Sequence, residues 1–172
     1  MSKQVWIGID PGQKGAISFI SEVRDHQFVR INDMPLLPNG EVDAPALEKM
    51  IDGYCSVDSH VTCALERSQP MPSQSAQSGF NYGVGYGAVK AVLHLMGVPF
   101  QEIPPIKWKK SFSLPKIEKG SAGKKKGKQE AITKCLELFP DVPRDKYYGP
   151  KGGMKDGRAE SLLLAEYARR SL

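Results

Sequence analysis

Two acidic residues four positions apart, Asp156 and Glu160, begin the last apolar-patterned segment of the chain. If this segment is an α-helix, the spacing places both carboxylates on one face, with their Cβ atoms about 5–6 Å apart. Like charges at this spacing destabilise a helix slightly, so a positive partner is expected between them if the pair has a function. The alternative is that Asp156 caps the helix and Glu160 is a solvated surface residue.

Two further acids end segments that are patterned as β-strands. Asp10 closes an alternating, β-branched run, and Glu66 closes a similar one. If these strands are neighbours in one sheet, both carboxylates lie at the same edge, and a last helix packed across that edge adds the other two acids. Four converging carboxylates cannot all ionise without compensation. Mg²⁺ takes carboxylate oxygens, and two such ions about 3.5–4 Å apart form the clamp used to hydrolyse phosphodiesters.

The elements that must position these acids follow from hydrophobic periodicity. Alternating runs predict strands over residues 4–10, 15–20, 26–34, 60–66 and 97–103. Spacings of three and four predict helices over residues 44–54, 78–96, 128–139 and 156–170. The first three strands have short connections and indicate an antiparallel meander, whereas the fourth is reached through a helix and should lie parallel to its neighbour. The prediction is an α/β fold in a single domain, residues 1–172.

The bulk composition narrows the class of protein. Mean hydropathy is −0.37, and no apolar run has transmembrane length, so no membrane partner is expected. The N-terminus runs directly into a predicted strand, without the pattern of a signal peptide. Three cysteines without a CxxC pair predict reduced thiols in a cytoplasmic protein and no structural zinc. The three histidines show no pattern of a nucleophilic triad and are interpreted as structural.

Positive charge is concentrated in one strip of the chain. Residues 107–128 hold nine lysines and a single acid, so the strip carries +8 and the remainder −3, against a total of +5. A mildly acidic body with one basic strip is typical of a protein that binds a polyanion. Glycines within the strip predict a mobile segment. The alternative is a solvated loop without a partner.

The ordered set of motifs resembles a known family. Gly8-Ile9-Asp10-Pro11-Gly12 with Gly15-Ala16, Leu65-Glu66, the helix from Gly79, and Asp156-Gly157-Arg158-Ala159-Glu160 are similar to RuvC-type Holliday junction resolvases of the RNase H-like superfamily. The resemblance spans about residues 4–170, and the last motif is closest in form to chloroplast-type and phage or viral resolvases. It implies a five-stranded mixed sheet flanked by helices. It also implies a homodimer that cuts a four-way DNA junction by paired, symmetric phosphodiester hydrolysis.

The resemblance also implies roles for the four acids. Asp10, Glu66, Asp156 and Glu160 match the catalytic, metal-binding carboxylates, which hold two Mg²⁺ or Mn²⁺ ions per active site; no small-molecule cofactor is expected. Asp10 would bridge both ions, Glu66 and Asp156 would each hold one, and Glu160 would ligate or orient the attacking water. The last pair departs from the bacterial pattern, in which the final two acids are closer together.

Contacts with branched DNA are expected from several segments. Residues 67–74 depart from the bacterial pattern in the region that inserts at the junction, and Met71 is a candidate wedge. Lysines that neutralise phosphates give affinity without sequence preference. The phosphate contacts are predicted at Lys107, Lys110, Lys124, Lys125, Lys126 and Arg158.

Two other functions remain open at this point. The same fold and metal chemistry could act on flaps, other branched DNA or RNA–DNA hybrids. A non-enzymatic binder of branched DNA would have lost at least one carboxylate, whereas all four are present. A nuclease of this kind would act in the cytoplasm, associated with the nucleoid, or in the host cytoplasm if it is encoded by a phage.

Overall fold

The computed structural model of the protein describes residues 3–24, 26–56, 58–67, 75–115 and 120–172. Its centre is a five-stranded mixed sheet in the order β3-β2-β1-β4-β5. The strands are β1 Lys3–Asp10, β2 Ala16–Val23, β3 His26–Asp33, β4 Ser59–Glu66 and β5 Phe100–Ile103. The first three strands run antiparallel, and β4 is parallel to both β1 and β5. The predicted meander, the parallel fourth strand and the α/β class are therefore confirmed.

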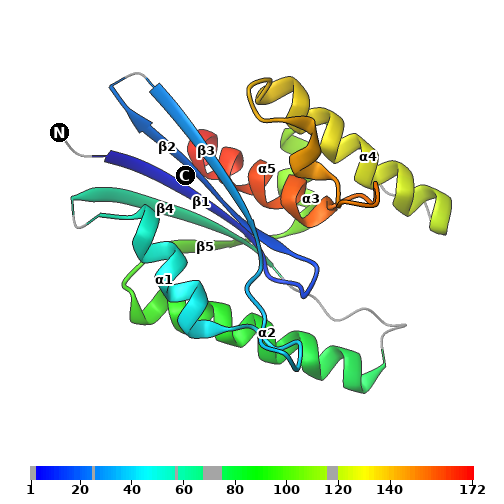
Figure 1. The fold of residues 1–172 in the computed structure, drawn as a ribbon, viewed down its shortest axis with the longest axis horizontal. Helices are drawn as coiled ribbons and strands as arrows, with labels where there is room; N and C mark the ends of the chain where they lie inside the picture. Colours follow the sequence, from blue (N-terminus) through cyan, green and yellow to red (C-terminus); the bar gives the residue numbers. More distant parts are fainter. Residues whose placement is uncertain (1–2, 25, 57, 68–74, 116–119) are drawn as a thin grey trace.

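Helices cover both faces of the sheet, as Figure 1 shows. The helices α1 (Ala44–Tyr54) and α2 (Ala76–Leu95) pack on one face, in an apolar cluster with alternate residues of β1. The helices α3 (Pro105–Ser111), α4 (Ser121–Leu138) and α5 (Asp156–Ser171) pack on the other face in a second cluster. No helix in the described ranges is long and apolar enough to span a membrane.

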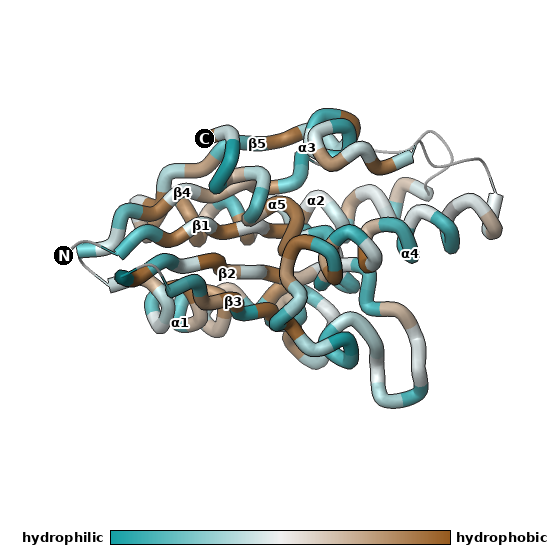
Figure 2. The backbone as a smooth tube through the Cα atoms, turned by 90° about the horizontal axis from the view of Figure 1, so that it is seen from above, coloured by the Kyte–Doolittle hydropathy of each residue, from teal (hydrophilic) through white to brown (hydrophobic). Residues whose placement is uncertain are grey.

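The helix α5 lies directly on the sheet and is apolar along most of its length. Its residues 161–165 are buried against β1, β2 and β4, where Figure 2 shows the apolar colour of the tube gathered. Near its end, buried Glu166 accepts hydrogen bonds from Arg169 and Arg170. Burial alone would raise the pKa of Glu166, but these two guanidinium groups outweigh it and hold the pKa below its ordinary value.

Two helices begin earlier than their patterns predict. Ser75 caps α2 by accepting a hydrogen bond from the Ser78 amide, so this helix starts at Ala76. The helix α4 starts at Ser121 and includes part of the basic strip, residues 121–128, because lysine has a high helix propensity and the apolar half of α4 extends the same helix. The strip also includes residues 107–111 of α3. Its mobility stays a prediction.

Candidate active site

The sheet places Asp10 and Glu66 side by side. Strands β1 and β4 are parallel and adjacent, and Ile9 pairs with Leu65. Asp10 and Glu66 are the next residues, so they lie beside each other at the carboxyl ends of the two strands. Carboxyl ends of parallel strands open toward one edge of the sheet, where α/β proteins commonly bind ligands. This juxtaposition matches the prediction from the strand pattern.

The helix α5 brings the other two acids to the same edge. Asp156 is its first residue, and Glu160 lies one turn later on the same face. The Asp10 carboxylate interacts electrostatically with Glu160, Glu66 and Asp156, and Glu66 also interacts with Glu160. The structure therefore brings together all four acids that the sequence singled out.

Two glycines permit this close crossing of α5. A Cβ atom on Gly8 of β1 would lie 2.0 Å from the Ser161 carbonyl oxygen and 2.2 Å from the Ala165 amide nitrogen. A Cβ atom on Gly157 would lie 2.3 Å from the Lys14 carbonyl oxygen, in the turn that follows β1. Any side chain at either position would push the helix, with Asp156 and Glu160, away from Asp10.

The buried acids resist ionisation. Burial raises the pKa of Asp10 well above its ordinary value, and the neighbouring charges of Glu160 and Glu66 raise it further. Burial and Glu160 raise the pKa of Glu66 to about 7, although Lys109 and a hydrogen bond from Trp108 act in the opposite direction. The site is therefore a cluster of carboxylates that requires added positive charge to ionise fully.

Side chains from α3 and α4 partly satisfy this requirement. Lys109 Nζ lies 2.6 Å from Glu160 Oε1, and Lys128 Nζ lies 2.9 Å from Asp156 Oδ2. Burial alone would lower the pKa of Lys109, but the acids around it outweigh burial and raise it. These lysines are the positive partners that the spacing of Asp156 and Glu160 requires. Nothing in the local sequence links either lysine to its acid, so neither pairing could be predicted.

The donor set suits a hard divalent cation. All four side chains offer carboxylate oxygens, the ligands that Mg²⁺ and Mn²⁺ prefer. Within the part of the chain that the structure describes, the side-chain conformations place no group of three or more His, Cys, Asp or Glu residues so that it could hold a metal ion. Two of the four carboxylates are instead paired with the lysines. Cation binding would therefore require Glu160 and Asp156 to turn from these ammonium groups.

The predicted DNA-contacting residues fall into three groups. Lys107 and Lys110 on α3 and Lys125 and Lys126 on α4 are exposed, as a phosphate contact requires. Met71 and the side chain of Lys124 lie outside the described residues. The Arg158 guanidinium is already engaged by Asp33 of β3 and by the Lys146 carbonyl oxygen. For each of these residues, contact with DNA stays a prediction.

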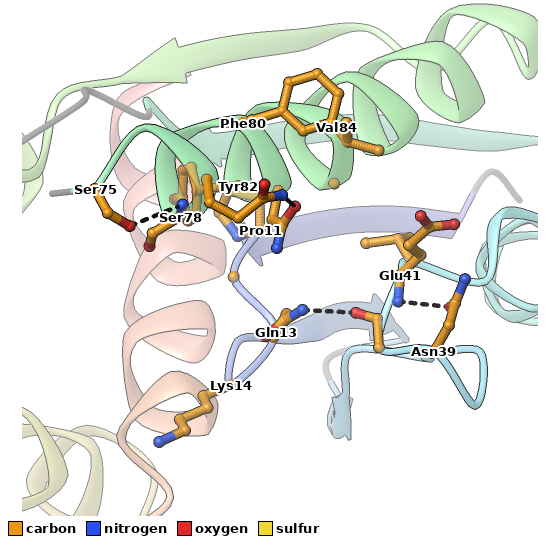
Figure 3. A pocket seen from close by; sticks show the side chains of 16 residues that line it. Pro11, Gln13, Lys14, Asn39, Glu41, Ser75, Ser78, Phe80, Tyr82 and Val84 are labelled. Carbon is orange, nitrogen blue, oxygen red and sulfur yellow. Dashed lines mark hydrogen bonds between the residues drawn. The ribbon is translucent and has the colours of Figure 1, made fainter.

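An open cavity lies beside the turn that follows Asp10, and none of the four acids lines it. It has a volume of about 650 Å³ and lies between the turn after β1, the loop at residues 39–42 and the first half of α2. Pro11 and Gly12 line it, immediately after Asp10, and so does the exposed Phe80 of α2, which Figure 3 labels. The amide groups of Gln77 and Asn81 also line it.

Comparison with solved structures finds proteins of similar fold. No protein-family model matches the chain, and no curated protein matches it in sequence. RuvC of Thermus thermophilus in complex with a Holliday junction substrate superposes with a TM-score of 0.58 at 16% identity, over 97% of this chain and 96% of that one. This protein has a RuvC-like fold. A second structure of Thermus thermophilus RuvC gives a TM-score of 0.55 at 18% identity, covering 96% of this chain and 95% of that one.

The RuvC-like fold spans nearly all of both chains, so it includes the sheet edge and α5. At this identity the likeness concerns the fold, and it does not distinguish a chloroplast-type from a phage subtype.

Proposed function

We propose that the protein is a metal-dependent endonuclease that resolves four-way DNA junctions by paired, symmetric hydrolysis. The observation that carries this proposal is the convergence of Asp10, Glu66, Asp156 and Glu160 at one edge of a RuvC-like sheet. One of the superposed RuvC structures holds a Holliday junction substrate. The basic strip supplies the charge that a four-way junction, a dense polyanion, requires.

The four acids, Asp10, Glu66, Asp156 and Glu160, would hold two divalent ions, Mg²⁺ or Mn²⁺. When bound, such ions activate water and stabilise the charge that develops on a phosphodiester. The protein contributes the placement: the adjacent strand ends fix Asp10 and Glu66, and α5 fixes the other pair. Lys109 and Lys128 balance the charges of Glu160 and Asp156, and their ammonium groups would be available to a phosphate at the site.

A homodimer is part of the proposal, because symmetric cleavage requires two active sites. The outer face of α2 supports it. Phe80 and Val84 are 68% and 41% exposed on this helix. A Cβ atom added at Gly79, Gly83 or Gly87 would meet nothing within 4 Å. A partner helix could therefore approach this face closely. We place the enzyme in the cytoplasm, where its DNA substrate lies.

The decisive experiment is cleavage of a synthetic four-way junction in Mg²⁺ with both strands end-labelled. We expect paired, symmetric nicks that yield ligatable duplexes. Asp10→Asn should abolish cleavage and retain junction binding, because the variant keeps the side-chain shape and removes the central carboxylate. The matched control is Asp52→Asn, the same exchange at an exposed position of α1.

The same assay separates the alternative substrates. Three-way junctions, flaps, RNA–DNA hybrids and linear duplexes are tested beside the four-way junction. A strong preference for flaps or hybrids would refute junction resolution and keep the metal-dependent chemistry. Full activity of Asp10→Asn would refute the assignment of the acids.

A further inference from the structure

Two consecutive residues of the short helix α3 contact two different acids of the site. Trp108 Nε1 donates a hydrogen bond to Glu66 Oε2 at 2.8 Å, and Lys109 Nζ pairs with Glu160 Oε1 at 2.6 Å. These partners are 42 and 51 residues apart in the sequence. The helix α3 thus connects the end of β4 with the first turn of α5.

We propose that Trp108 is a positioning residue that fixes the Glu66 carboxylate for binding of a divalent cation. This inference rests on the proposed function, since it assigns Glu66 to an ion. Lys109 brings a positive charge that competes with a cation for its carboxylate. The indole N–H is a neutral donor with no acceptor atom, so it neither replaces a cation nor ligates one.

The contact with Trp108 leaves most of Glu66 available. An ionised carboxylate has about four lone-pair positions on two oxygens. The indole occupies one of them on Oε2, and the remaining positions, including both on Oε1, can face an ion. A single hydrogen bond from a rigid ring therefore sets the orientation of the carboxylate without removing its capacity to bind metal. Groups that orient a metal ligand in this way commonly change metal affinity 10–100-fold when they are removed.

The indole is well placed for this role because it cannot move independently. Trp108 is fully buried in the apolar cluster formed by α3, α4 and α5. The Ser111 hydroxyl donates to the Trp108 carbonyl oxygen at 2.7 Å and strengthens the short helix around it. The competing explanation is that Glu66 merely satisfies the hydrogen-bonding requirement of a buried indole. The two explanations differ in what Trp108 does to metal affinity.

The test measures Mn²⁺ binding by the electron paramagnetic resonance signal of free Mn²⁺, which does not depend on catalysis. Trp108→Phe keeps an aromatic ring and removes the donor. We expect its Mn²⁺ affinity to fall at least about tenfold. Trp6→Phe is the matched control, because it makes the same exchange at the chain's other tryptophan, on β1 between Ile20 and Thr62. Its affinity should be unchanged. Equal affinity in folded Trp108→Phe, or equal loss in both variants, would overturn the inference.

A second readout covers a Trp108→Phe variant that fails to fold. In Trp6→Phe, Trp108 is the remaining tryptophan, so its emission reports on the indole beside Glu66. Saturation with Mg²⁺ should shift or change this emission, and Glu66→Gln should abolish the change. Unaltered emission at an Mg²⁺ concentration that supports cleavage would overturn the inference.

Failure of the inference can be told apart from failure of the proposed function. A wild-type protein that binds no Mn²⁺ and cuts no junction would overturn both. A wild-type protein that binds Mn²⁺ and cuts junctions, beside a Trp108→Phe variant of equal affinity, would overturn the role of Trp108 alone.

Discussion

The crossing of α5 over β1 makes a strong prediction for Gly8→Ala. The added methyl carbon would lie 2.0 Å from the Ser161 carbonyl oxygen, whereas an ordinary van der Waals contact begins at 3.4 Å. The obstructing atoms belong to the backbone of α5 and cannot rotate away, so the helix must move outward by more than about 1 Å. Overpacking a core costs about 1–3 kcal/mol. Because backbone is obstructed, we expect the upper end of this range and a melting temperature lowered by about 6–12 °C.

The same displacement of α5 should lower the rate of cleavage more strongly than it lowers the melting temperature. The helix α5 carries Asp156 and Glu160, and a misplacement of about 1 Å can lower an enzymatic rate about 100-fold. The assays are thermal unfolding and cleavage of the four-way junction at a temperature where Gly8→Ala is folded. Gly53→Ala is the control, because a Cβ atom there meets nothing within 4 Å in helix α1. It should raise the melting temperature by about 2–4 °C. A Gly8→Ala protein that melts within about 2 °C of wild type would refute the proposed tight crossing.

The remaining predictions concern charge. The lowered pKa of Glu166 means that its stabilisation is present above the unfolded value near 4.5 and is lost as pH falls through the folded value. In urea unfolding, Glu166→Gln should lower the free energy of unfolding by about 2 kcal/mol at pH 7, because it loses charge-assisted hydrogen bonds from two partly exposed arginines. This difference from wild type should shrink toward pH 3, and a difference that stays constant with pH would contradict the prediction. Replacing Lys125 and Lys126 by alanine should reduce the slope of log affinity against log salt by about two for junction DNA, and an unchanged slope would remove them from the interface. Arg158→Met should lower the melting temperature by a few degrees, because it loses the hydrogen bonds to Asp33 of β3. If this variant also reduces the slope of log affinity against log salt by about one, Arg158 contacts a phosphate.

The sequence predicts the sheet and its acids because both depend on local patterns. Strand periodicity identifies β1 and β4, and the helix between them requires parallel neighbours, which brings Asp10 to Glu66. The i,i+4 spacing then identifies the pair on α5. Each of these features depends on the spacing of a few neighbouring residues. Local spacing therefore accounts for the strands and for the placement of the four acids.

The contacts that complete the site could not be predicted in this way. Trp108 and Lys109 reach acids 42 and 51 residues away in the sequence, and no local periodicity specifies such a pairing. The start of α4 could not be predicted for a different reason. Glycines among residues 120–127 indicate a flexible segment, yet the helix that packs through its apolar second half extends back to Ser121.

The order of the acids along the chain has a consequence during synthesis. Asp10 and Glu66 emerge from the ribosome about 90 residues or more before Asp156 and Glu160, within strands that can begin to pair. Until α5 docks, half of the carboxylates are missing and Gly8 faces no helix. The full set of four acids therefore forms only when α5 docks, and a translation product interrupted before residue 156 would carry the basic strip with only Asp10 and Glu66 of that set.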